Sequence, residues 1–424
     1  MIISVRMENT SIFSDQIEFS LKSDMRNKKF SSNVHSEKNV NILKVAGVYG
    51  PNNVGKTCLI KCIKNIRNVL LQKTNTINSN LFSKNVISKL GVSFLEGGRE
   101  FDYSFHYNSK LDEYPYEQLV EIEKDKYNNE SQQILLLRDT VNKKYQCNNK
   151  ELQKVLPIVS KNNILIYLMD VDSFIELQEM KEILTSFASK IDILDMNNIP
   201  LEHTIEIMKN KNNLQSQIVD FIKQADLDLD NFEYRDNDKI QYDVFKAKNG
   251  KPSEKVLDIP QKIQDTIKLT SVYKGVSVPS LLFDSTGTKK IAALASYIIE
   301  ALRDGRILVI DELDSSIHFK LTRAIVAMFN NQLNDNAQLI FTTHDINLMD
   351  CKKLFRKEQI WFIHKDSDRV YLYSLADFKA TQGVRDTSDI VEKYRKGLLG
   401  SLPDPDFISF LVDLKDINKD SADE

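Results

Sequence analysis

Apolar and polar residues recur along this chain with the two periods expected of an α/β protein. IISVRMEN (2–9) and QIEFSLKSD (16–24) alternate between the two kinds of residue, which predicts two half-buried strands. The almost continuously apolar NILKVAGVYG (41–50) predicts a buried strand. The segment 57–72 has helical periodicity, with an apolar stripe made of Leu59, Cys62, Ile63, Ile66, Val69 and Leu70.

The pattern changes twice further along the chain. Residues 91–108 predict a hairpin with its turn at Glu96-Gly97-Gly98, and α/β texture returns between 266 and 378. From about 160 to 265, amphipathic helical patterns dominate and are separated by polar turns. We therefore expect an α/β head with N-terminal antiparallel strands, formed by residues 1–160 and 266–424, and an inserted, mainly helical region at 161–265.

Composition places the chain among ordinary soluble globular proteins. Its 424 residues are 42% hydrophobic and 28% charged, and the formal net charge is −3. This balance argues against a protein that coats nucleic acid by charge alone, although a local basic groove stays open. The four cysteines have neither disulfide-framework nor zinc spacing. With no signal peptide and no membrane-spanning run in the sequence, we expect a cytoplasmic protein that does not contact a membrane.

The strongest chemical signal is GVYGPNNVGKT at residues 47–57. Gly50-Pro51-Asn52-Asn53-Val54-Gly55-Lys56-Thr57 fits the pattern G-x-x-x-x-G-K-[ST], after a strand and before a helix. The glycines let backbone amides turn towards phosphate oxygens, and the helix N-terminus adds positive potential. We expect Lys56 to reach the β- and γ-phosphates of ATP and the Thr57 hydroxyl to bind Mg²⁺. The predicted nucleotide-binding segment runs from Gly50 to Cys58.

Two later strands end in residues suited to act on a nucleotide. RILVIDELDSSIH (306–318) ends its apolar run at Asp311-Glu312, where Asp311 can hold Mg²⁺ and Glu312 can polarise the attacking water. AQLIFTTHDINLMD (337–350) is a second buried strand, and its His344 suits a γ-phosphate sensor. Two adjacent acids or a lone histidine are often only structural. Here they follow strands in a chain that also has a phosphate loop.

A further anion site is predicted at the start of the helix in FDSTGTKKIAALASYIIEAL (283–302). Ser285, Gly287 and Thr288 place small side chains and free amides at a helix N-terminus, where anions bind. Because the loop at 50–57 is expected to hold the nucleotide of this chain, one explanation for a second anion site is that it serves a nucleotide bound to another subunit.

These motifs, in this order, resemble a known group of proteins. GPNNVGKT, STGTKK, ILVIDELDSSIH and FTTHD are similar to the ABC-type ATPase heads of chromosome-maintenance, RecF and OLD proteins. The chain resembles most the AAA15-like group of stand-alone AAA-family ATPases in bacterial antiphage systems, such as the PARIS and abortive-infection L types. RKEQIWFIHKDSDRVYLYSLADF and RDTSDIVEKYRKGLLGSLPDPD resemble the R-x-x-Q-I-W-F strand and the Y-x-x-G-x-x-G-x-x-P ending of this group. The resemblance covers the segments near 1–125 and 265–405, and it implies an ABC-ATPase-like P-loop head whose mixed sheet is flanked by helices.

The resemblance also implies a role for each matched residue. Lys56 and Thr57 would bind phosphate and Mg²⁺, and Asp311 would hold the same Mg²⁺. Glu312 would be the catalytic base, and His344 would be the switch histidine.

The remaining matched residues imply a dimer. Ser285, Gly287 and Thr288 correspond to the signature motif, which in this superfamily contacts the γ-phosphate held by the opposing protomer. A dimer that forms or tightens with ATP is therefore expected, alone or within a larger homo-oligomer. The segment that would line its interface contains Asp314, Ser315 and His318. The chain differs from transporter heads at three positions. Lys289 and Lys290 stand where transporters have an acidic residue or glutamine, and Phe319 replaces the proline common after the histidine.

The resemblance favours one cellular role. It implies a sensor or regulatory ATPase of an antiphage system, responding to a phage product and controlling an effector. Only 424 − 378 = 46 residues follow Phe378, too few for the nuclease domain of OLD-type proteins, so the effector is expected on a separate, neighbouring polypeptide. A DNA-repair or chromosome-associated ATPase that contacts DNA stays open as the alternative. A transporter subunit fits the signature poorly.

Overall fold

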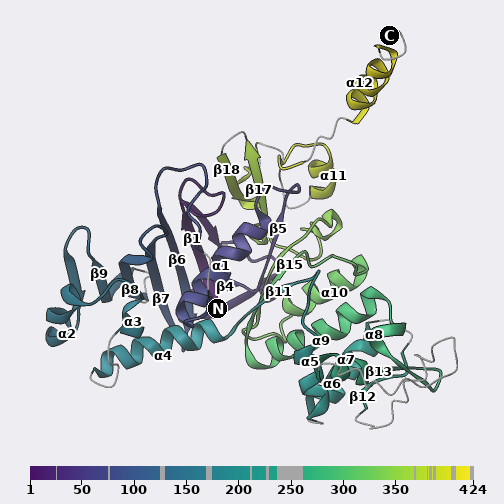
Figure 1. The fold of residues 1–424 in the computed structure, drawn as a ribbon, viewed down its shortest axis with the longest axis horizontal. Helices are drawn as coiled ribbons and strands as arrows, with labels where there is room; N and C mark the ends of the chain where they lie inside the picture. The colour runs from purple at the N-terminus through teal and green to yellow at the C-terminus, as the bar shows by residue number, and fades with distance from the viewer. Residues whose placement is uncertain are drawn as a thin grey trace, which may run out of the picture.

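Two β-sheets with a helix between them form the body of the protein (Figure 1). The computed structural model describes residues 1–424 apart from 25, 75–76, 125–128, 169–173, 211–212, 226–228, 236–260, 367–368, 380, 382–383, 385–387, 403–406 and 421–424. The first sheet is antiparallel and has the order β10-β9-β8-β7-β6-β1-β2. Its strands are β1 (Ile2–Glu8), β2 (Ile17–Ser20), β6 (Ile87–Glu96), β7 (Arg99–Asn108), β8 (Glu113–Lys124), β9 (Glu130–Asp139) and β10 (Lys144–Cys147).

The second sheet is mixed and has the order β11-β15-β16-β5-β17-β18. Its first five strands run parallel, and β18 closes the edge antiparallel to β17. The strands are β5 (Val45–Tyr49), β11 (Ile191–Asp195), β15 (Ile307–Asp311), β16 (Gln338–Thr342), β17 (Ile360–Asp366) and β18 (Arg369–Ser374). Strands β5, β15 and β16 are buried along their whole length, because helices cover both faces of this sheet.

Helices on the two faces of the mixed sheet build two separate cores. Helix α1 (Lys56–Leu70) lies between the sheets, and its apolar stripe packs in one cluster with Phe94 and Phe101 of the antiparallel sheet and Val309 of the mixed sheet. Helices α9 (Thr286–Asp304) and α10 (Phe319–Phe329) pack in a second cluster on the opposite face. The start of α1 and the start of α9 are therefore positioned by opposite faces of one sheet.

Gln338 fastens the two sheets together at the beginning of β16. Its side-chain amide nitrogen donates to the carbonyls of Ile2 at 2.9 Å and Leu43 at 3.0 Å, and its oxygen accepts from the Ile2 amide at 2.8 Å. The side chain is fully buried. Because each of these polar groups has a hydrogen-bond partner, the bonds offset the cost of burying them, and the contact fixes β16 against β1.

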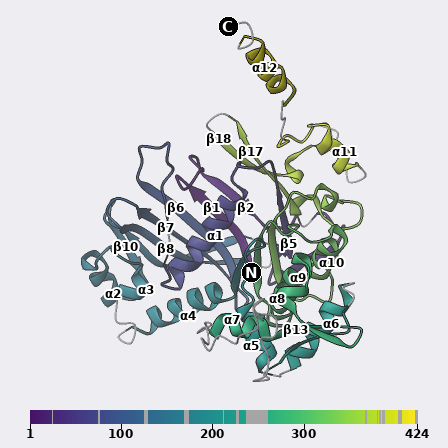
Figure 2. The same cartoon turned by 45° about the vertical axis from the view of Figure 1, so that its right-hand side comes forward.

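A smaller unit attaches to α9 (Figure 2). It contains α5 (Glu202–Lys209), α6 (Asn213–Gln224), α7 (Gln261–Lys268) and a three-stranded sheet of β12 (Asn231–Tyr234), β13 (Leu269–Tyr273) and β14 (Val276–Pro279). Apolar residues of α5 and α6 pack with Ala292 and Ala295 of α9. The Thr204 and Ser296 hydroxyls, 2.9 Å apart, add a buried polar contact.

The remaining elements complete the surface. They are β3 (Val34–Glu37), β4 (Val40–Leu43), α2 (Lys150–Val155), α3 (Leu165–Leu168), α4 (Ile175–Ser189), α8 (Ser280–Phe283), α11 (Ile390–Arg395) and α12 (Phe407–Asp420). Helix α12 stands apart from the rest of the chain in Figure 1. No helix within the described ranges combines the length and the apolar character needed to cross a membrane.

Most of the local predictions hold. The hairpin predicted at 91–108 is β6–β7, and Gly97 and Gly98 both have positive φ in its two-residue turn. The predicted strands at 2–9 and 16–24 are β1 and β2, and the predicted helix is α1. The predicted buried strand at 41–50 divides at Lys44 into β4, which pairs with β3, and β5.

The structure differs from the predicted limits of the insertion, 161 and 265. Strand β11 lies inside that segment but pairs in parallel with β15, and α4 packs against α1. Conversely, β13 and β14 follow residue 265 but belong to the small sheet beside α9. Amphipathic periodicity shows that a helix buries one face, but it does not show which neighbour covers that face, so the pattern placed α4 in the wrong unit.

Candidate nucleotide-binding site

The predicted site residues meet at one edge of the mixed sheet. Strands β15, β16 and β5 are parallel neighbours, with Ile310 opposite Phe341 and Thr342 opposite Val48. Their carboxyl ends therefore lie side by side. The chain leaves these ends as the glycine loop at 50–55, the acidic pair 311–312 and the segment 343–345.

Backbone conformation explains the loop sequence. Gly50, Asn53 and Gly55 all have positive φ, at 159°, 61° and 112°. A Cβ on Gly50 would lie 2.5 Å from the carbonyl oxygen of Ile363 in β17, so only glycine fits beneath that strand. Asparagine tolerates the left-handed region better than most residues, which accounts for Asn53. The loop can thus turn back above the start of α1.

Lys56 closes the loop from inside. Its ammonium donates to the carbonyls of Gly50 at 2.7 Å and Pro51 at 2.8 Å. Burial lowers the pKa of Lys56 to about 8, while the carboxylates of Glu312, Asp311 and Asp314 oppose that shift. The cation therefore faces the acidic pair across the mouth of the loop.

Thr342, at the end of the middle strand, organises the acidic pair. Its fully buried hydroxyl donates to Asp311 Oδ1 at 2.5 Å and accepts from the Glu312 amide at 2.8 Å. Glu312 itself has a φ of 56°, in the left-handed region. One hydroxyl thus fixes both the Asp311 carboxylate and the backbone turn that presents Glu312.

The segment 343–345, called the switch segment here after its predicted switch histidine, is tied to Asp314, two residues after the acidic pair. The backbone amide of His344 donates to the two carboxylate oxygens of Asp314 at 3.2 and 3.3 Å. Burial and the nearby Lys56 lower the pKa of His344. Its imidazole therefore favours the neutral form beside the cation of the loop.

Thr57 and Asp311 supply oxygens suited to magnesium. Thr57 is exposed at the second position of α1, and Asp311 is only 8% exposed at the end of β15. Two protein oxygens, with phosphate and water completing the sphere, match the way Mg²⁺ is held in nucleotide sites. Cys58 is half-buried, and its thiol lies close to Ser11 and Ile12, so only its backbone can face a bound phosphate.

The glycine loop and the switch segment share one cavity. It has a volume of about 350 Å³ and is lined by Tyr49, Gly50, Pro51, Asn52, Thr343, His344, Ile346, Tyr394 and Leu402. Tyr394 and Leu402 come from the C-terminal segment that follows β18. Its turn is held by a hydrogen bond from the Tyr394 hydroxyl to the Ser401 carbonyl at 2.7 Å and by one from Ser401 Oγ to the Ile363 carbonyl.

The predicted signature residues form a different cavity. Ser285 caps α9 by accepting from the Thr288 amide at 3.1 Å. A hollow of about 590 Å³ is lined there by Ser285, Gly287 and Thr288, together with Ser316, His318 and Lys320 from the segment after β15. None of these residues lines the cavity of the glycine loop. Ser285, Gly287 and Thr288 are therefore not brought to the nucleotide loop of their own chain.

The three departures from transporter heads lie around this second cavity. Lys290 donates to the carbonyl and hydroxyl oxygens of Ser315, both at 3.1 Å. Lys289 donates to the Leu281 carbonyl at 3.2 Å. Phe319 is the first residue of α10 and is 46% exposed. Nearby, α8 exposes Leu282 and Phe283, at 58% and 64%.

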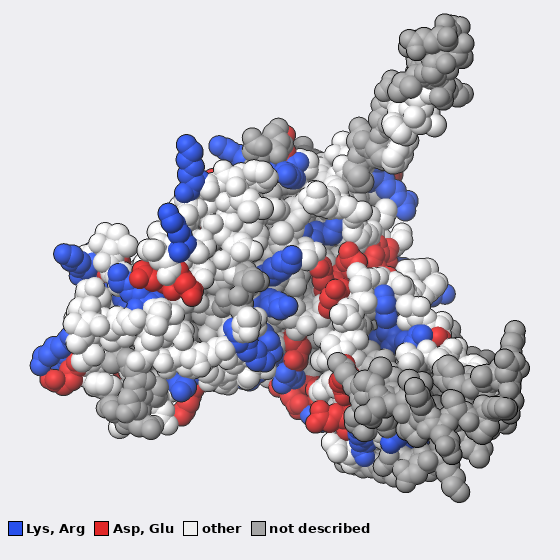
Figure 3. All heavy atoms as spheres, in the orientation of Figure 1, with Lys and Arg blue, Asp and Glu red and all other residues white. Residues whose placement is uncertain are grey.

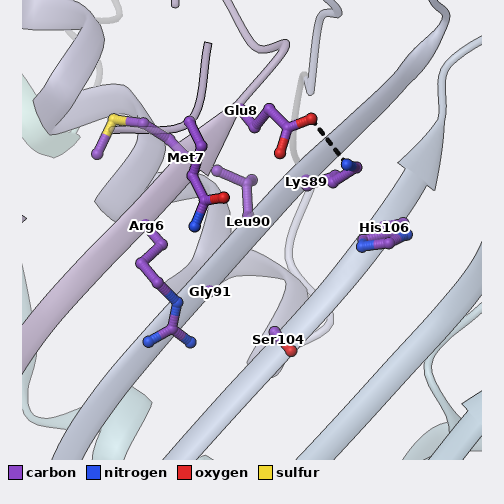
Figure 4. Close-up of a pocket in the computed structure, with 9 residues that line it drawn as sticks. Arg6, Met7, Glu8, Lys89, Leu90, Gly91, Ser104 and His106 are labelled. Atoms are coloured by element: carbon purple, nitrogen blue, oxygen red, sulfur yellow. Dashed lines mark hydrogen bonds and ion pairs between the residues drawn. The ribbon is translucent and has the colours of Figure 1, made fainter. Parts of the chain in front are cut away.

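A third hollow, of about 220 Å³, lies on the antiparallel sheet and contains none of the predicted residues (Figure 4). Its two cations are already paired, Lys89 with Glu8 at 2.7 Å and Arg6 with Asp102 at 2.7 Å. Pairing leaves little free positive charge for an anion. On the molecular face in Figure 3, basic and acidic side chains are interspersed.

Three contributors to the site escaped sequence reasoning. Thr342 lies inside the segment FTTHD. Its hydroxyl, at the end of a strand next to the strand that ends in Asp-Glu, could have indicated its role. Asn197, which donates to Glu312 Oε2 at 2.8 Å, follows β11, whose membership of the sheet was not predicted. Tyr394 was recognised only as part of a tail motif.

The fold and the loop define the class of protein. A strand–glycine-loop–helix unit, an acidic pair at the end of a parallel strand and a buried strand between them make up a P-loop nucleotide-binding fold, with an antiparallel sheet contributed by the N-terminal part of the chain. A sequence profile described as "AAA domain, putative AbiEii toxin, Type IV TA system" matches residues 45–350. The chain belongs to this family.

The solved structures that resemble this chain include three SMC head domains. The SMC head domain from Thermotoga maritima is 12% identical, with a TM-score of 0.41, and the match covers 88% of this chain and 98% of that one. An SmcHead bound to the C-winged helix domain of ScpA is 12% identical, with a TM-score of 0.43 and coverages of 90% and 99%. An Smc head domain from Pyrococcus furiosus, bound to the C-terminal domain of ScpA, is 11% identical, with a TM-score of 0.38 and coverages of 93% and 99%. A search of curated protein sequences found no match.

Replacing Thr342 by valine should destabilise the protein by ~1–3 kcal/mol, because the change leaves the Glu312 amide and the buried Asp311 carboxylate without a partner. Urea unfolding measures this free energy. Thr322→Val is the matched control, since the Thr322 hydroxyl is buried on α10 with no partner in the described structure. The control should be neutral or stabilising, and equal losses for the two variants would contradict the role given to Thr342.

Proposed function

We propose that this protein binds and hydrolyses ATP in a site shared by two copies of the chain. The observation that carries the proposal is the division of the site. The glycine loop, acidic pair and switch histidine converge at one sheet edge, whereas the signature residues line a separate cavity at the start of α9. Phosphoryl chemistry needs charge stabilisation around the γ-phosphate as well as a held nucleotide and a placed water.

Within one chain, each converging residue has a distinct task. The amides of residues 50–57 and Lys56 hold the phosphates. Thr57 and Asp311 would hold Mg²⁺, which would supply positive charge to neutralise the phosphates. Glu312 accepts a proton from the attacking water, and His344 contacts the γ-phosphate. Lys56 must leave the Gly50 and Pro51 carbonyls to reach the nucleotide.

A second copy completes the site by docking head-to-tail. Ser285, Gly287 and Thr288 of each copy would then approach the γ-phosphate held by the other, and two-fold symmetry gives two equivalent sites. Exposed apolar side chains beside the signature cavity, including Phe283 and Phe319, suit a surface that becomes buried in that dimer. ATP joins the two copies, and its hydrolysis releases them.

For the cellular role, we propose a regulatory ATPase of an antiphage system that controls an effector encoded beside it. The family description, which names a putative toxin and a toxin–antitoxin system, supports such a setting. The segments that resemble the antiphage group include Tyr394 and Leu402, which line the cavity of the glycine loop. A trigger that binds this C-terminal segment would therefore change the surroundings of the nucleotide. Homo-oligomers larger than a dimer are compatible with this role.

Glu312→Gln should bind ATP but hydrolyse it ~10²–10⁴-fold more slowly, because it lacks the general base. The variant should therefore accumulate as an ATP-bound dimer, measured by light scattering after gel filtration with Mg²⁺ and ATP. Lys56→Ala, which cannot hold the phosphates, is the control and should not respond to ATP. A Glu312→Gln protein that stays monomeric at saturating ATP would rule out the shared site.

The defence role predicts a functional link to the adjacent gene. Co-expression of the two genes should arrest growth when the trigger is present, and Lys56→Ala should abolish the arrest while the two proteins are still made. A neighbouring membrane permease, or ATPase activity stimulated by double-stranded DNA alone, would count against this role and favour the transporter or DNA-repair alternative respectively.

A further inference from the structure

Asn197 occupies a turn that is fixed against the end of the Asp-Glu strand. The turn follows β11, the parallel neighbour of β15. Its backbone is held at two points, by the Met196 amide donating to the Asp311 carbonyl at 3.1 Å and by the Asn197 amide donating to Asp195 Oδ1 at 2.9 Å. The position of Asn197 is therefore set by the same strand that carries Asp311.

Both ends of the Asn197 side chain are used. Its amide nitrogen donates to Glu312 Oε2 at 2.8 Å, and its amide oxygen accepts from Ser315 Oγ at 3.0 Å. Reversing the amide would place its oxygen against the carboxylate, so the two contacts fix one orientation. Among the described residues, no other side chain makes a hydrogen bond with the Glu312 carboxylate.

Ser315 extends this contact to the signature helix. Its hydroxyl and carbonyl oxygens both accept from Lys290 Nζ, at 3.1 Å. Lys290 lies one turn into α9, whose first residues line the signature cavity. A continuous set of hydrogen bonds therefore runs from α9 through Ser315 and Asn197 to Glu312.

The backbone at Glu312 leaves its side chain free to take more than one rotamer, which a hydrogen bond from Asn197 can restrict. Glu312 adopts a left-handed conformation, and only its backbone amide is fixed by Thr342. Its side chain is half-buried and has several rotamers within reach. A donor to the carboxylate selects one of these rotamers, and a hydrogen bond to a charged acceptor is stronger than a neutral one.

We propose that Asn197 is a positioning residue of the ATPase site, which orients the Glu312 carboxylate and links it through Ser315 to the signature helix. This inference rests on the proposed ATP hydrolysis. Since the signature helix would meet the nucleotide of the second copy, docking of that copy would be transmitted to Glu312 of this chain. The link is a path of contacts that joins α9, through Lys290 and Ser315, to the turn after β11.

The test compares Asn197→Ala and Asn197→Asp with Asn198→Asp in the full-length protein. Asn198 is the neighbouring exposed residue, and its side chain makes no described contact with Glu312. Steady-state hydrolysis of Mg-ATP should show kcat reduced about tenfold in Asn197→Ala, which is ~1.4 kcal/mol of activation free energy, with KM changed less than about twofold. Asn197→Asp keeps the shape and the Ser315 contact but faces Glu312 with a like charge, so its loss should be at least as large. Asn198→Asp should match the wild type.

A double substitution tests the link to the signature helix. Ser315→Ala should lower kcat by a smaller factor than Asn197→Ala, and the double variant should be no slower than Asn197→Ala alone. Factors that multiply would mean that Ser315 acts independently of Asn197, which would overturn the link.

The outcomes separate this inference from the proposed function. If Glu312→Gln is inactive but both Asn197 variants match Asn198→Asp, Asn197 does not position Glu312 and the ATPase proposal stands. If Glu312→Gln hydrolyses ATP at the wild-type rate, the proposed function itself fails. Because Asn197 is exposed, its variants should also keep the wild-type melting temperature, and a loss of activity that parallels a loss of stability would assign Asn197 a structural role only.

Discussion

The register of three parallel strands is the constraint on which the site depends. Because β15, β16 and β5 end level, a glycine loop, two carboxylates and a histidine from distant parts of the chain reach one edge. Thr342, on the middle strand, holds the Asp311 carboxylate and the Glu312 amide at once. Gln338 anchors the other end of the same strand to the antiparallel sheet. A shift of β16 by one residue would turn Thr342 to the opposite face and separate the acidic pair from the loop.

Covering both faces of this sheet also explains why the site is divided. Helix α1 must start at the glycine loop to bury its stripe between the two sheets, and α9 must pack on the other face. The two helix N-termini, which are the natural positions for phosphate, therefore face different cavities. One chain cannot bring both to one nucleotide without unpacking a core. In the proposed dimer a second copy would supply the other helix N-terminus, and the polar contacts from Lys290 to Glu312 would connect its arrival to the proposed catalytic base.

Prediction from the sequence was correct for the strands, turns and helices that depend on local order. The loop, the acidic pair and the histidine each follow an apolar strand, and glycine or asparagine occurs where φ is positive. Prediction failed where a residue depends on a strand or segment that is distant in the sequence. No residue near Asn197 in the sequence indicates that β11 pairs with β15. That pairing depends on which strand occupies the edge of the sheet, far away in the sequence. The predicted helical insertion therefore includes this segment. The lining of the loop cavity by Tyr394 depends in the same way on the fold of the C-terminal turn.

The most direct measurement of a shared site mixes two inactive proteins. Lys56→Ala removes the phosphate-holding half, and Ser285→Arg blocks the signature half, so each alone should hydrolyse almost no ATP. A mixed dimer contains one intact site, formed by Lys56 of the second protein and Ser285 of the first. With random pairing, an equimolar mixture should recover about one quarter of the wild-type rate. No recovery, in a mixture where co-capture through two different tags proves that mixed oligomers form, would show that the two halves do not act on the same nucleotide.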